Sequence, residues 1–199
     1  MYRSAEGTGT TARFDNIKDI DFLSSTELIC TDYSNHCLRL VDFSRSPPQT
    51  SAYAGSCTVS GKAEGHRLNS AQLEYPEFTE VNKDQSSLFV LVYRKTLHMI
   101  DLKTDNLSTL KAFDKVCLDM ILTDDHLLYF LRQHLVAVFN PRTREEQVVA
   151  GSNSIGRAVG PFEDTRFNKP LRFVPWSDEV NTLLLIADHS NNRFAGLPA

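Results

Sequence analysis

The feature that most constrains the fold is a short pattern that occurs twice, once near each end of the chain. In both copies a hydrophobic run ends in Asp, and Asn follows three positions later, as Asp32 with Asn35 and as Asp188 with Asn191. A further strand follows each turn. Short polar side chains of this kind hydrogen-bond nearby backbone amides and favour tight reversals. The four residues are therefore predicted to be structural, satisfying backbone groups where two strands reverse.

The strand after the turn recurs along the chain. Residues 38–42, 97–101 and 136–140 each form an apolar strand that ends in Asp or Asn. Glycine-punctuated connectors, which open with Ala-Gly-Ser at 54–56 and 150–152, follow the first and third of these repeats. Repeats of about 40 residues with several short strands are typical of β-propeller blades.

The strands expected in each repeat are short and apolar, turn residues separate them, and no segment has a sustained helical period. Four strands are expected in each of the first three repeats: 17–22, 28–31, 38–42 and 50–54; 78–81, 87–92, 96–101 and 107–110; and 116–122, 127–131, 135–140 and 146–150. The fourth repeat is expected to hold only two strands, 171–174 and 182–187, and to end before its third.

We therefore predict an all-β protein, a β-propeller segment with three four-stranded blades and a partial fourth. A single segment spans 1–199, with blades at about 12–56, 72–112, 115–151 and 166–199. Sheets that are buried on both sides between neighbouring blades explain near-continuous apolar runs such as 88–92. A β-sandwich is the alternative, but its strands would alternate more cleanly because one face meets water.

Composition narrows the class of protein. Hydrophobic residues make up 41% and charged residues 23% of the 199 residues, so a folded chain with a core is expected. The net charge is −4 and no run of Lys or Arg exceeds a pair, which argues against a nucleic-acid partner. No apolar run is long enough to span a membrane, and residues 1–10 lack the apolar stretch of a secretion signal. If the protein is extracellular, either a signal has been removed or the chain is an internal piece.

At these residues the sequence resembles the NHL-repeat propellers. The positions that match the family's connector and turn are Ala54, Gly55, Gly61, Gly65, Ala71, Leu73, Pro76, Asp32, Asn35, Leu38, Asp188, Asn191, Arg193 and Phe194. The second and third repeats depart, because Leu91 with Arg94 and Phe130 with Gln133 replace Asp and Asn. The resemblance implies a propeller of roughly six blades, so a fragment, an isoform or one part of a split propeller is expected, with the remaining blades elsewhere. It implies little about function, because propellers host unrelated activities.

The four cysteines do not have the spacing of a zinc site. Cys37 begins a strand, where the family's repeat often has Arg, and Cys57 follows the next strand. The two would lie near the same end of neighbouring strands, which makes a disulfide geometrically reasonable. The pairing also resembles that of extracellular invertebrate members of the family, although two unpaired thiols are the alternative. Cys30 and Cys117 fall in apolar strands and are expected to be buried.

Asn106 opens an Asn-Leu-Ser sequon in a predicted turn, and a glycan there would suit a secreted protein. Sequons often arise by chance, so this adds only slight weight. Together with the predicted disulfide, it favours a secreted protein or an ectodomain. A cytoplasmic location is the alternative.

Residues that could carry catalysis are few. No Gly-x-Ser-x-Gly elbow or phosphate-binding loop is present, and no nucleophile has a supporting base nearby. A peptide lyase of the resembled family holds zinc with histidines from several blades. Few of the histidines here share a register in the repeats: His36, His66, His98, His126, His134 and His189. No catalytic residue, metal site or cofactor is therefore predicted.

The functional prediction is a non-catalytic module that mediates protein–protein interaction. Rigid blades position variable turns, so loops on one face are expected to bind the partner. The candidate surface comprises residues assigned to the turns between second and third strands: Tyr33, His36, Arg94, Arg132 and His189. Two alternatives stay open: a metal-dependent propeller hydrolase or lyase and, less favoured, an RNA-binding NHL domain.

Overall fold

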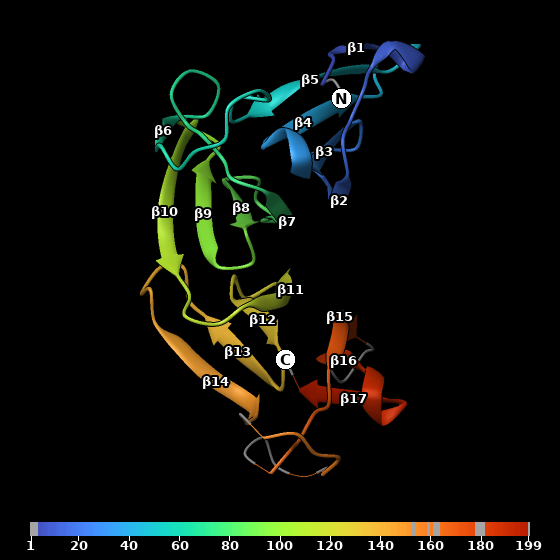
Figure 1. The fold of residues 1–199 in the computed structure, drawn as a ribbon, viewed down its shortest axis with the longest axis vertical. Coiled ribbons are helices and arrows are strands. Elements are labelled where there is room, and N and C mark those ends of the chain that lie inside the picture. Colours follow the sequence, from blue (N-terminus) through green and yellow to red (C-terminus); the bar gives the residue numbers. More distant parts are fainter. Residues whose placement is uncertain (1–3, 153, 159, 161–163, 178–181, 199) are drawn as a thin grey trace. The chain divides into compact units, whose positions relative to one another are not determined.

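The computed structural model describes residues 4–152, 154–158, 160, 164–177 and 182–198. The chain forms two compact units, Met1–Phe113 and Asp114–Ala199, which are called the first and the second unit. Each unit contains two antiparallel β-sheets, and the strands of every sheet are consecutive in the sequence (Figure 1).

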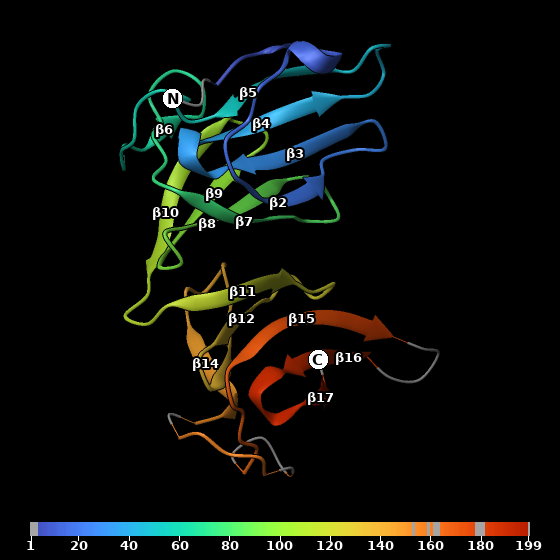
Figure 2. The same ribbon diagram turned by 45° about the vertical axis from the view of Figure 1, so that its right-hand side comes forward.

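The first sheet follows the predicted pattern closely. Its main strands are β2 Ile17–Phe22, β3 Glu27–Asp32, β4 Cys37–Asp42 and β5 Gln49–Ala54, which lie side by side in Figure 2. A two-residue strand, β1 Gly7–Thr8, pairs with β5 at the outer edge. The four predicted strands are confirmed to within one residue at each end.

The second sheet, also in the first unit, repeats this arrangement. Its main strands are β7 Pro76–Val81, β8 Ser87–Val92, β9 Thr96–Asp101 and β10 Asn106–Ala112. The short strand β6 Gly65–His66 pairs with β10 at the outer edge. The four predicted strands are again confirmed, here to within two residues at each end.

The second unit contains the third and fourth sheets. The third sheet consists of β11 Cys117–Leu122, β12 Leu128–Arg132, β13 Leu135–Phe139 and β14 Glu146–Gly151. The fourth consists of β15 Pro170–Ser177, β16 Thr182–Asp188 and β17 Arg193–Pro198. All strands predicted in this unit are confirmed.

Two strand predictions need correction. The fourth repeat does not end before its third strand, because β17 pairs with β16 along its whole length. Gly196 and Pro198 disfavour a strand by propensity, so the segment reads as a tail until its partner is known. In addition, the first two sheets have five strands rather than four, because the connectors contribute β1 and β6. A strand of two residues is too short to show periodicity in a sequence.

The core of the first unit lies between its two sheets. Buried residues of the first sheet, such as Ile29 and Leu38, form one cluster with Leu88 and Val90 of the second sheet. Leu73, from the connector between the sheets, is fully buried in the same cluster. Burial of each such side chain stabilises the fold by about 1.5–3 kcal/mol. The second unit has the same plan, with the connector residue Phe167 packed among residues of both its sheets.

Carboxylates also join the inner strands of neighbouring sheets. Asp19 Oδ2 on β2 accepts a hydrogen bond from the backbone N–H of Thr79 on β7 (2.9 Å). In the second unit, Asp119 Oδ2 on β11 accepts one from the backbone N–H of Phe173 on β15 (2.9 Å). Burial raises the pKa of Asp119, and the hydrogen bond from the backbone N–H of Phe173 partly opposes the shift. In both units, a carboxylate on the first main strand of one sheet therefore binds the backbone of the next sheet.

The order of the strands decides between the two predicted folds. A sandwich of Greek-key type exchanges strands between sheets, whereas each sheet here is made of consecutive strands. The chain is therefore an all-β propeller segment with four blades, the last of which has three strands in the described residues. The propeller prediction is confirmed, and the sandwich alternative is wrong. That the four blades belong to one domain spanning 1–199, with the predicted blade bounds, stays a prediction.

Candidate functional site

The turn between β3 and β4 is organised by the Asp32 carboxylate. Asp32 Oδ1 accepts hydrogen bonds from the backbone N–H of Asp15 (2.8 Å) and from Asn35 Nδ2 (2.9 Å). Its other oxygen lies 3.5 Å from Arg39 Nη1, and both of these side chains are fully buried. Burial raises the pKa of Asp32, while the hydrogen bonds and Arg39 oppose the shift. The carboxylate thus ties the turn to β4 and to the segment that precedes β2.

The turn between β16 and β17 has the same plan. Asp188 Oδ1 accepts a hydrogen bond from the backbone N–H of Asn168 (2.7 Å). Asp188 Oδ2 accepts hydrogen bonds from Asn191 Nδ2 (2.7 Å) and Arg193 Nε (2.8 Å). Asn191 Nδ2 also donates to the backbone oxygen of Gly156 (2.6 Å). In both turns the Asp carboxylate accepts a hydrogen bond from a backbone N–H, and in the second turn Asn191 also binds a backbone oxygen.

The cysteines behave as predicted. A Cys37–Cys57 disulfide, with an S–S distance of 2.03 Å, links the first residue of β4 to the connector that follows β5. Cys30 and Cys117 are free and buried. Burial raises the pKa of Cys30 to about 12 and that of Cys117 to about 11. Both thiols therefore stay protonated near neutral pH and have little reactivity.

Four aromatic side chains gather at one end of the first unit. The Tyr75 ring lies 4.9 Å from Tyr33, 4.4 Å from His36 and 5.7 Å from Tyr93, measured between ring centroids. Tyr33 and His36 come from the β3–β4 turn, Tyr75 immediately precedes β7, and Tyr93 immediately follows β8. We call these four residues the tyrosine surface. Tyr93 is 57% exposed, and the other three are partly exposed.

The backbone under the tyrosine surface is strained. His36, Tyr75, Tyr93 and the adjacent Arg94 all have φ between 52° and 61°. The left-handed region costs a residue other than glycine about 1 kcal/mol, and bulky side chains are uncommon there. Such strain tends to gather at functional sites. The backbone N–H of Tyr75 donates to His36 Nδ1 (3.3 Å), so neutral His36 carries its proton on Nε2.

Charged side chains border the tyrosine surface. Lys18 Nζ lies 5.1 Å from the centroid of the Tyr33 ring, which is within cation–π range. Arg94 Nε donates to Glu77 Oε2 at 2.6 Å, and the Glu77 side chain is buried while Arg94 is 44% exposed. Burial raises the pKa of Tyr33, and the nearby Glu77 carboxylate adds to this shift. Tyr33 therefore presents a neutral hydroxyl at physiological pH.

The predicted binding residues fall into two groups. Tyr33, His36 and Arg94 belong to the first unit and lie on or beside the tyrosine surface. Arg132 and His189 belong to the second unit. The sequence reasoning missed Tyr75 and Tyr93, although both flank predicted strands at turn positions where a large exposed aromatic residue is a recognisable signal.

The two residues of the second unit differ from each other. Arg132 is the last residue of β12 rather than a turn residue, and its side chain is only 12% exposed because it pairs with Glu146. His189 begins the β16–β17 turn and is exposed, with its Nδ1 atom 3.5 Å from Ser190 Oγ. Of the two, only His189 is therefore open to a partner at a turn.

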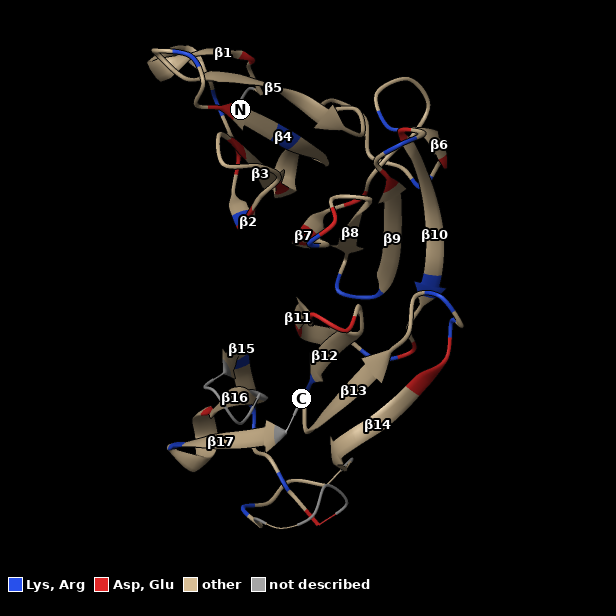
Figure 3. Ribbon diagram, turned by 180° about the vertical axis from the view of Figure 1, so that it is seen from behind, with Lys and Arg blue, Asp and Glu red and all other residues tan. Residues whose placement is uncertain are grey.

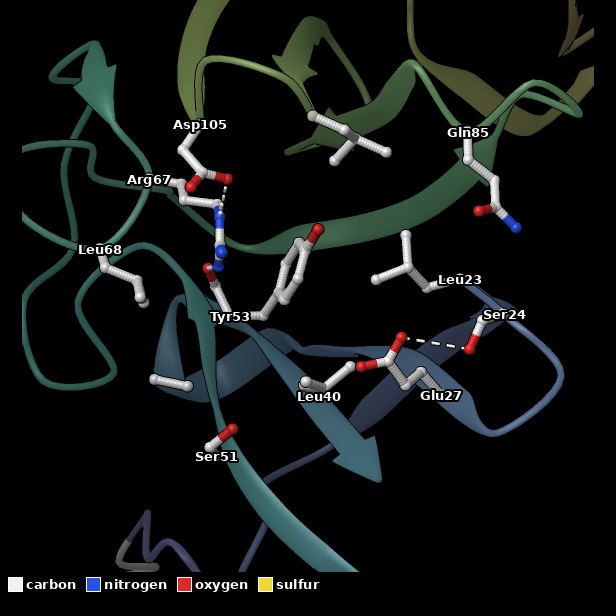
Figure 4. Close-up of a pocket in the computed structure, with 12 residues that line it drawn as sticks. Leu23, Ser24, Glu27, Leu40, Ser51, Tyr53, Arg67, Leu68, Gln85 and Asp105 are labelled. Atoms are coloured by element: carbon white, nitrogen blue, oxygen red, sulfur yellow. Dashed lines mark hydrogen bonds and ion pairs between the residues drawn. The ribbon is translucent and has the colours of Figure 1, made fainter. Parts of the chain in front are cut away.

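A cavity of about 610 Å³ lies at the opposite end of the two sheets of the first unit (Figure 4). Arg67 stacks over the Tyr53 ring at 4.3 Å and donates to Asp105 Oδ1 and to the backbone oxygen of Tyr53, both at 2.6 Å. Figure 4 shows the Tyr53 hydroxyl pointing into the cavity, with Glu27 and Gln85 on other walls. Burial raises the pKa of Tyr53, so its hydroxyl stays protonated and can donate a hydrogen bond.

The sequon residue Asn106 is exposed, but it is the first residue of β10 rather than part of a turn. It pairs with Asp101 and His66, and the next residue, Leu107, is buried. The Asn side chain is therefore accessible, while the predicted location in a turn is wrong.

In the part of the chain that the structure describes, no group of three or more His, Cys, Asp or Glu side chains is placed to hold a metal ion. His98 is buried, and its Nδ1 atom lies 3.1 Å from Thr109 Oγ1. Burial lowers the pKa of His98 to about 4, against a small opposing effect of Glu64. Within the same described ranges, no helix has the length and apolar character needed to cross a membrane.

Comparison with known proteins supports the fold. No protein-family model and no curated protein match the sequence. A structural genomics protein of unknown function from Bacteroides thetaiotaomicron is 11% identical, with a TM-score of 0.66 over 99% of this chain and 44% of its own. An auxiliary nutrient binding protein from Bacteroides ovatus is 12% identical, with a TM-score of 0.70 over 93% of this chain and 45% of its own.

A third similar structure, the computationally designed Ika4 protein, has about the same length as this chain. It is 7% identical, with a TM-score of 0.53, and the match covers 92% of this chain and 91% of the designed one. At these identities the similarity shows the fold alone. The chain spans less than half the length of the two Bacteroides proteins.

Proposed function

We propose that the chain is a non-catalytic binding module of NHL-propeller type and that the tyrosine surface contacts its partner. The carrying observation is that three turns bring Tyr33, His36, Tyr75 and Tyr93 together as partly exposed rings. Tyrosine offers a large rigid contact area and a polar hydroxyl, and it is enriched in protein interfaces. The sheets beneath hold these turns in place.

A protein segment is the partner that this surface suits best. Aromatic rings form its centre, while Lys18 and the Arg94–Glu77 pair supply charge at its border, as in interfaces with an apolar core and a polar rim. RNA suits it less, because blue basic and red acidic segments are interspersed in each unit (Figure 3) and the net charge is −4. We expect the partner to be a peptide or a protein loop with apolar and charged side chains.

Assignment to the NHL type is part of the proposal. The hydrogen bonds of Asp32 with Asn35 and of Asp188 with Asn191 support it, because they give the matching positions a shared structural role. The second and third blades lack these residues. An extracellular location is likewise proposed, supported by the Cys37–Cys57 disulfide and by the accessible Asn106.

The test begins with a phage-displayed random peptide library panned on the purified chain. Selected peptides are then titrated against the wild type and against Tyr93→Ala and Arg94→Ala, which change exposed side chains. Phe43→Ala is the matched control, because Phe43 is a 48% exposed aromatic residue in the β4–β5 turn, away from the tyrosine surface. We expect at least a tenfold loss of affinity in the first two variants and none in the control. Equal binding by all variants, or no enrichment of any peptide, would overturn the proposal.

A second candidate function is the binding of a small neutral polar molecule, such as a monosaccharide, in the cavity of Figure 4. The observation that favours it is the combination of the Tyr53 hydroxyl, Glu27 and Gln85 with the apolar walls Leu23 and Leu40, which is typical of small-molecule sites. One of the structurally similar proteins is described as an auxiliary nutrient binding protein.

Saturation-transfer NMR with a panel of monosaccharides tests this second function. Signal transfer that is present in the wild type and lost in Tyr53→Phe would support it, because the phenyl ring keeps the packing beneath Arg67 and removes only the hydroxyl. Absence of transfer to every sugar, or equal transfer in the variant, would refute it.

A further inference from the structure

The three tyrosine rings of the tyrosine surface are joined through Tyr75, which contacts the other two. Its ring plane is tilted by 42° from that of Tyr33 and by 53° from that of Tyr93. Rings tilted in this way do not stack over their full faces, and all three side chains are at least partly exposed. The surface therefore offers parts of several aromatic faces, at angles to one another, to an apolar ligand.

The polar groups around these rings are mainly hydrogen-bond donors. Because His36 Nδ1 accepts a backbone N–H, the neutral imidazole has its N–H at Nε2. The Tyr33 hydroxyl stays protonated, and the Lys18 ammonium can only donate. The Glu77 carboxylate is buried and already accepts a hydrogen bond from Arg94. A ligand with many acceptors and few N–H groups therefore suits the surface best.

A proline-rich segment has this combination of groups. Proline presents an apolar ring and lacks a backbone N–H. In the polyproline II conformation the backbone makes no internal hydrogen bonds, so its carbonyl oxygens are free to accept. Such a segment is largely ordered before it binds, which lowers the entropic cost of binding. Surfaces lined with aromatic side chains are a recurring way to bind segments of this kind.

The exposed charges beside the rings determine which flanking residues a ligand should have. Lys18 is exposed, and its Nζ atom lies 5.1 Å from the centroid of the Tyr33 ring. Lys95 is exposed in the β8–β9 turn, the turn that also contains Tyr93. The Arg94–Glu77 pair adds no net charge. Electrostatic complementarity therefore favours acidic over basic residues in the ligand.

We propose that the partner of the tyrosine surface is a proline-rich segment in the polyproline II conformation, with acidic residues beside the prolines. This inference rests on the proposed binding function and adds the chemical class of the partner. The prolines pack on the tyrosine rings, and the peptide carbonyls accept hydrogen bonds from the Tyr33 hydroxyl and from His36 Nε2. A carboxylate of the segment lies near Lys18.

The first test compares three synthetic peptides of equal length, each titrated by calorimetry into the 199-residue chain. One has about eight prolines flanked by glutamates, and the second has lysines in place of the glutamates. The third keeps the glutamates and replaces the prolines with alternating glycine and serine. We expect the acidic proline peptide to bind about tenfold more tightly than either of the others.

Variants of the chain then locate the bound peptide. Tyr93→Ala removes an exposed ring and should weaken the acidic proline peptide by about tenfold. Tyr33→Phe keeps the ring and removes only the hydroxyl, so a smaller loss, roughly threefold, is expected. Lys18→Gln should remove the preference for the acidic over the basic proline peptide. The matched control is Lys103→Gln, an exposed lysine at the opposite end of the second sheet, which should keep that preference.

The outcomes separate this inference from the proposed function. If library-selected peptides bind at the tyrosine surface but the acidic proline peptide binds no better than the glycine–serine peptide, the class of partner is wrong and the binding surface stands. If no peptide binds at all, both proposals fail. Equal binding of the acidic proline peptide by Tyr93→Ala and the wild type would also overturn the inference, because the prolines would then lie elsewhere.

Discussion

The two Asp-x-x-Asn turns have one backbone design and two different anchors. Both are short 3-10 turns that end in a left-handed residue, His36 with φ of 61° and Asn192 with φ of 50°. At the first position of the following strand they diverge. The β16–β17 turn has Arg193 there, which binds Asp188, whereas the β3–β4 turn has Cys37, which forms a disulfide. Both turns thus have an Asp–Arg pair, and the first turn adds a covalent bond at the position where the second has its arginine.

The strand after each turn has its arginine at a different position. Arg39 lies two residues beyond Cys37 and ties β4 to the segment before β2. Arg193 uses its two terminal nitrogens on the backbone oxygens of Arg157 (2.9 Å) and Arg166 (2.8 Å) in the connector before β15. In both blades an arginine binds the backbone of the segment that precedes the blade. The same role is thus filled from two different positions of the strand in these two blades.

The largest expected effect is the removal of the turn carboxylates. Asp188→Ala leaves the poorly exposed Arg193 without its charged partner, and breaking a buried pair in this way costs about 3–5 kcal/mol. Asp32→Ala should cost less, about 2–3 kcal/mol, because Arg39 Nη1 lies 3.5 Å from the Asp32 carboxylate, whereas Arg193 Nε donates to Asp188 at 2.8 Å. Urea titrations measure the free energy of unfolding, and amide exchange of the neighbouring strands assigns each loss to its unit.

Asp114→Ala is the control for both carboxylate variants, because Asp114 is exposed and should contribute less than about 0.5 kcal/mol. Equal losses in Asp32→Ala and Asp188→Ala would mean that the two anchors do not differ in the way the structure indicates.

The next largest effect concerns the covalent anchor. The disulfide joins residues 20 positions apart, and a loop of this size stabilises the folded state by about 3 kcal/mol. A Cys37→Ser, Cys57→Ser double variant should lose this amount, with the loss confined to amides of the first unit. Reductant should destabilise the wild type equally and leave the double variant unchanged. A further response of the double variant would show that the reductant acts elsewhere.

How well the sequence predicts the fold and the site depends on how far apart in the sequence the interacting residues are. The strands are local features of apolar runs and turn residues, so most were predicted to within two residues, but β15 extends three residues beyond its prediction and β1, β6 and β17 were missed. The hairpin made the Cys37–Cys57 bridge geometrically reasonable, and the family resemblance favoured it over two unpaired thiols. The convergence of Tyr75 on Tyr33 could not be predicted, because it depends on how the second sheet stacks on the first. Arg132 was misplaced because its cross-strand partner, Glu146, is distant in sequence and withdraws it from the surface.

A smaller effect sharpens the comparison within the first unit, where His98 holds the position in the second sheet that Arg39 holds in the first. Burial lowers the pKa of His98 to about 4 from 6.5. The folded state prefers the neutral ring. The stabilisation that neutral His98 gives the folded state is therefore complete above pH 6.5, and it is lost as the pH falls toward 4. The loss is about 2–3 kcal/mol. In His98→Gln, urea titrations should show that the free energy of unfolding no longer falls for this reason between pH 6.5 and pH 4. Glu64 is still present in this variant, so its own titration is not removed. An unaltered slope would contradict the assignment.

The smallest effect on stability is expected when the residues of one turn are exchanged for those of the other. This exchange tests whether the first turn serves binding as well as structure. Tyr33→His with His36→Asn gives the first turn the His-Ser-Asn-Asn sequence of the second. Asparagine accepts the left-handed conformation readily, and the lost ring contacts with Tyr75 are worth about 0.5–1.5 kcal/mol, so the net change in unfolding free energy should be under about 1 kcal/mol. Peptides selected on the wild type should no longer bind, because two of the four rings of the tyrosine surface are replaced.

The reverse exchange, His189→Tyr with Asn192→His, should also be tolerated but should add no peptide binding, since the second unit supplies no described ring contacts around that turn. Retained peptide binding in the first exchange would show that the turn is only a scaffold and that recognition lies elsewhere.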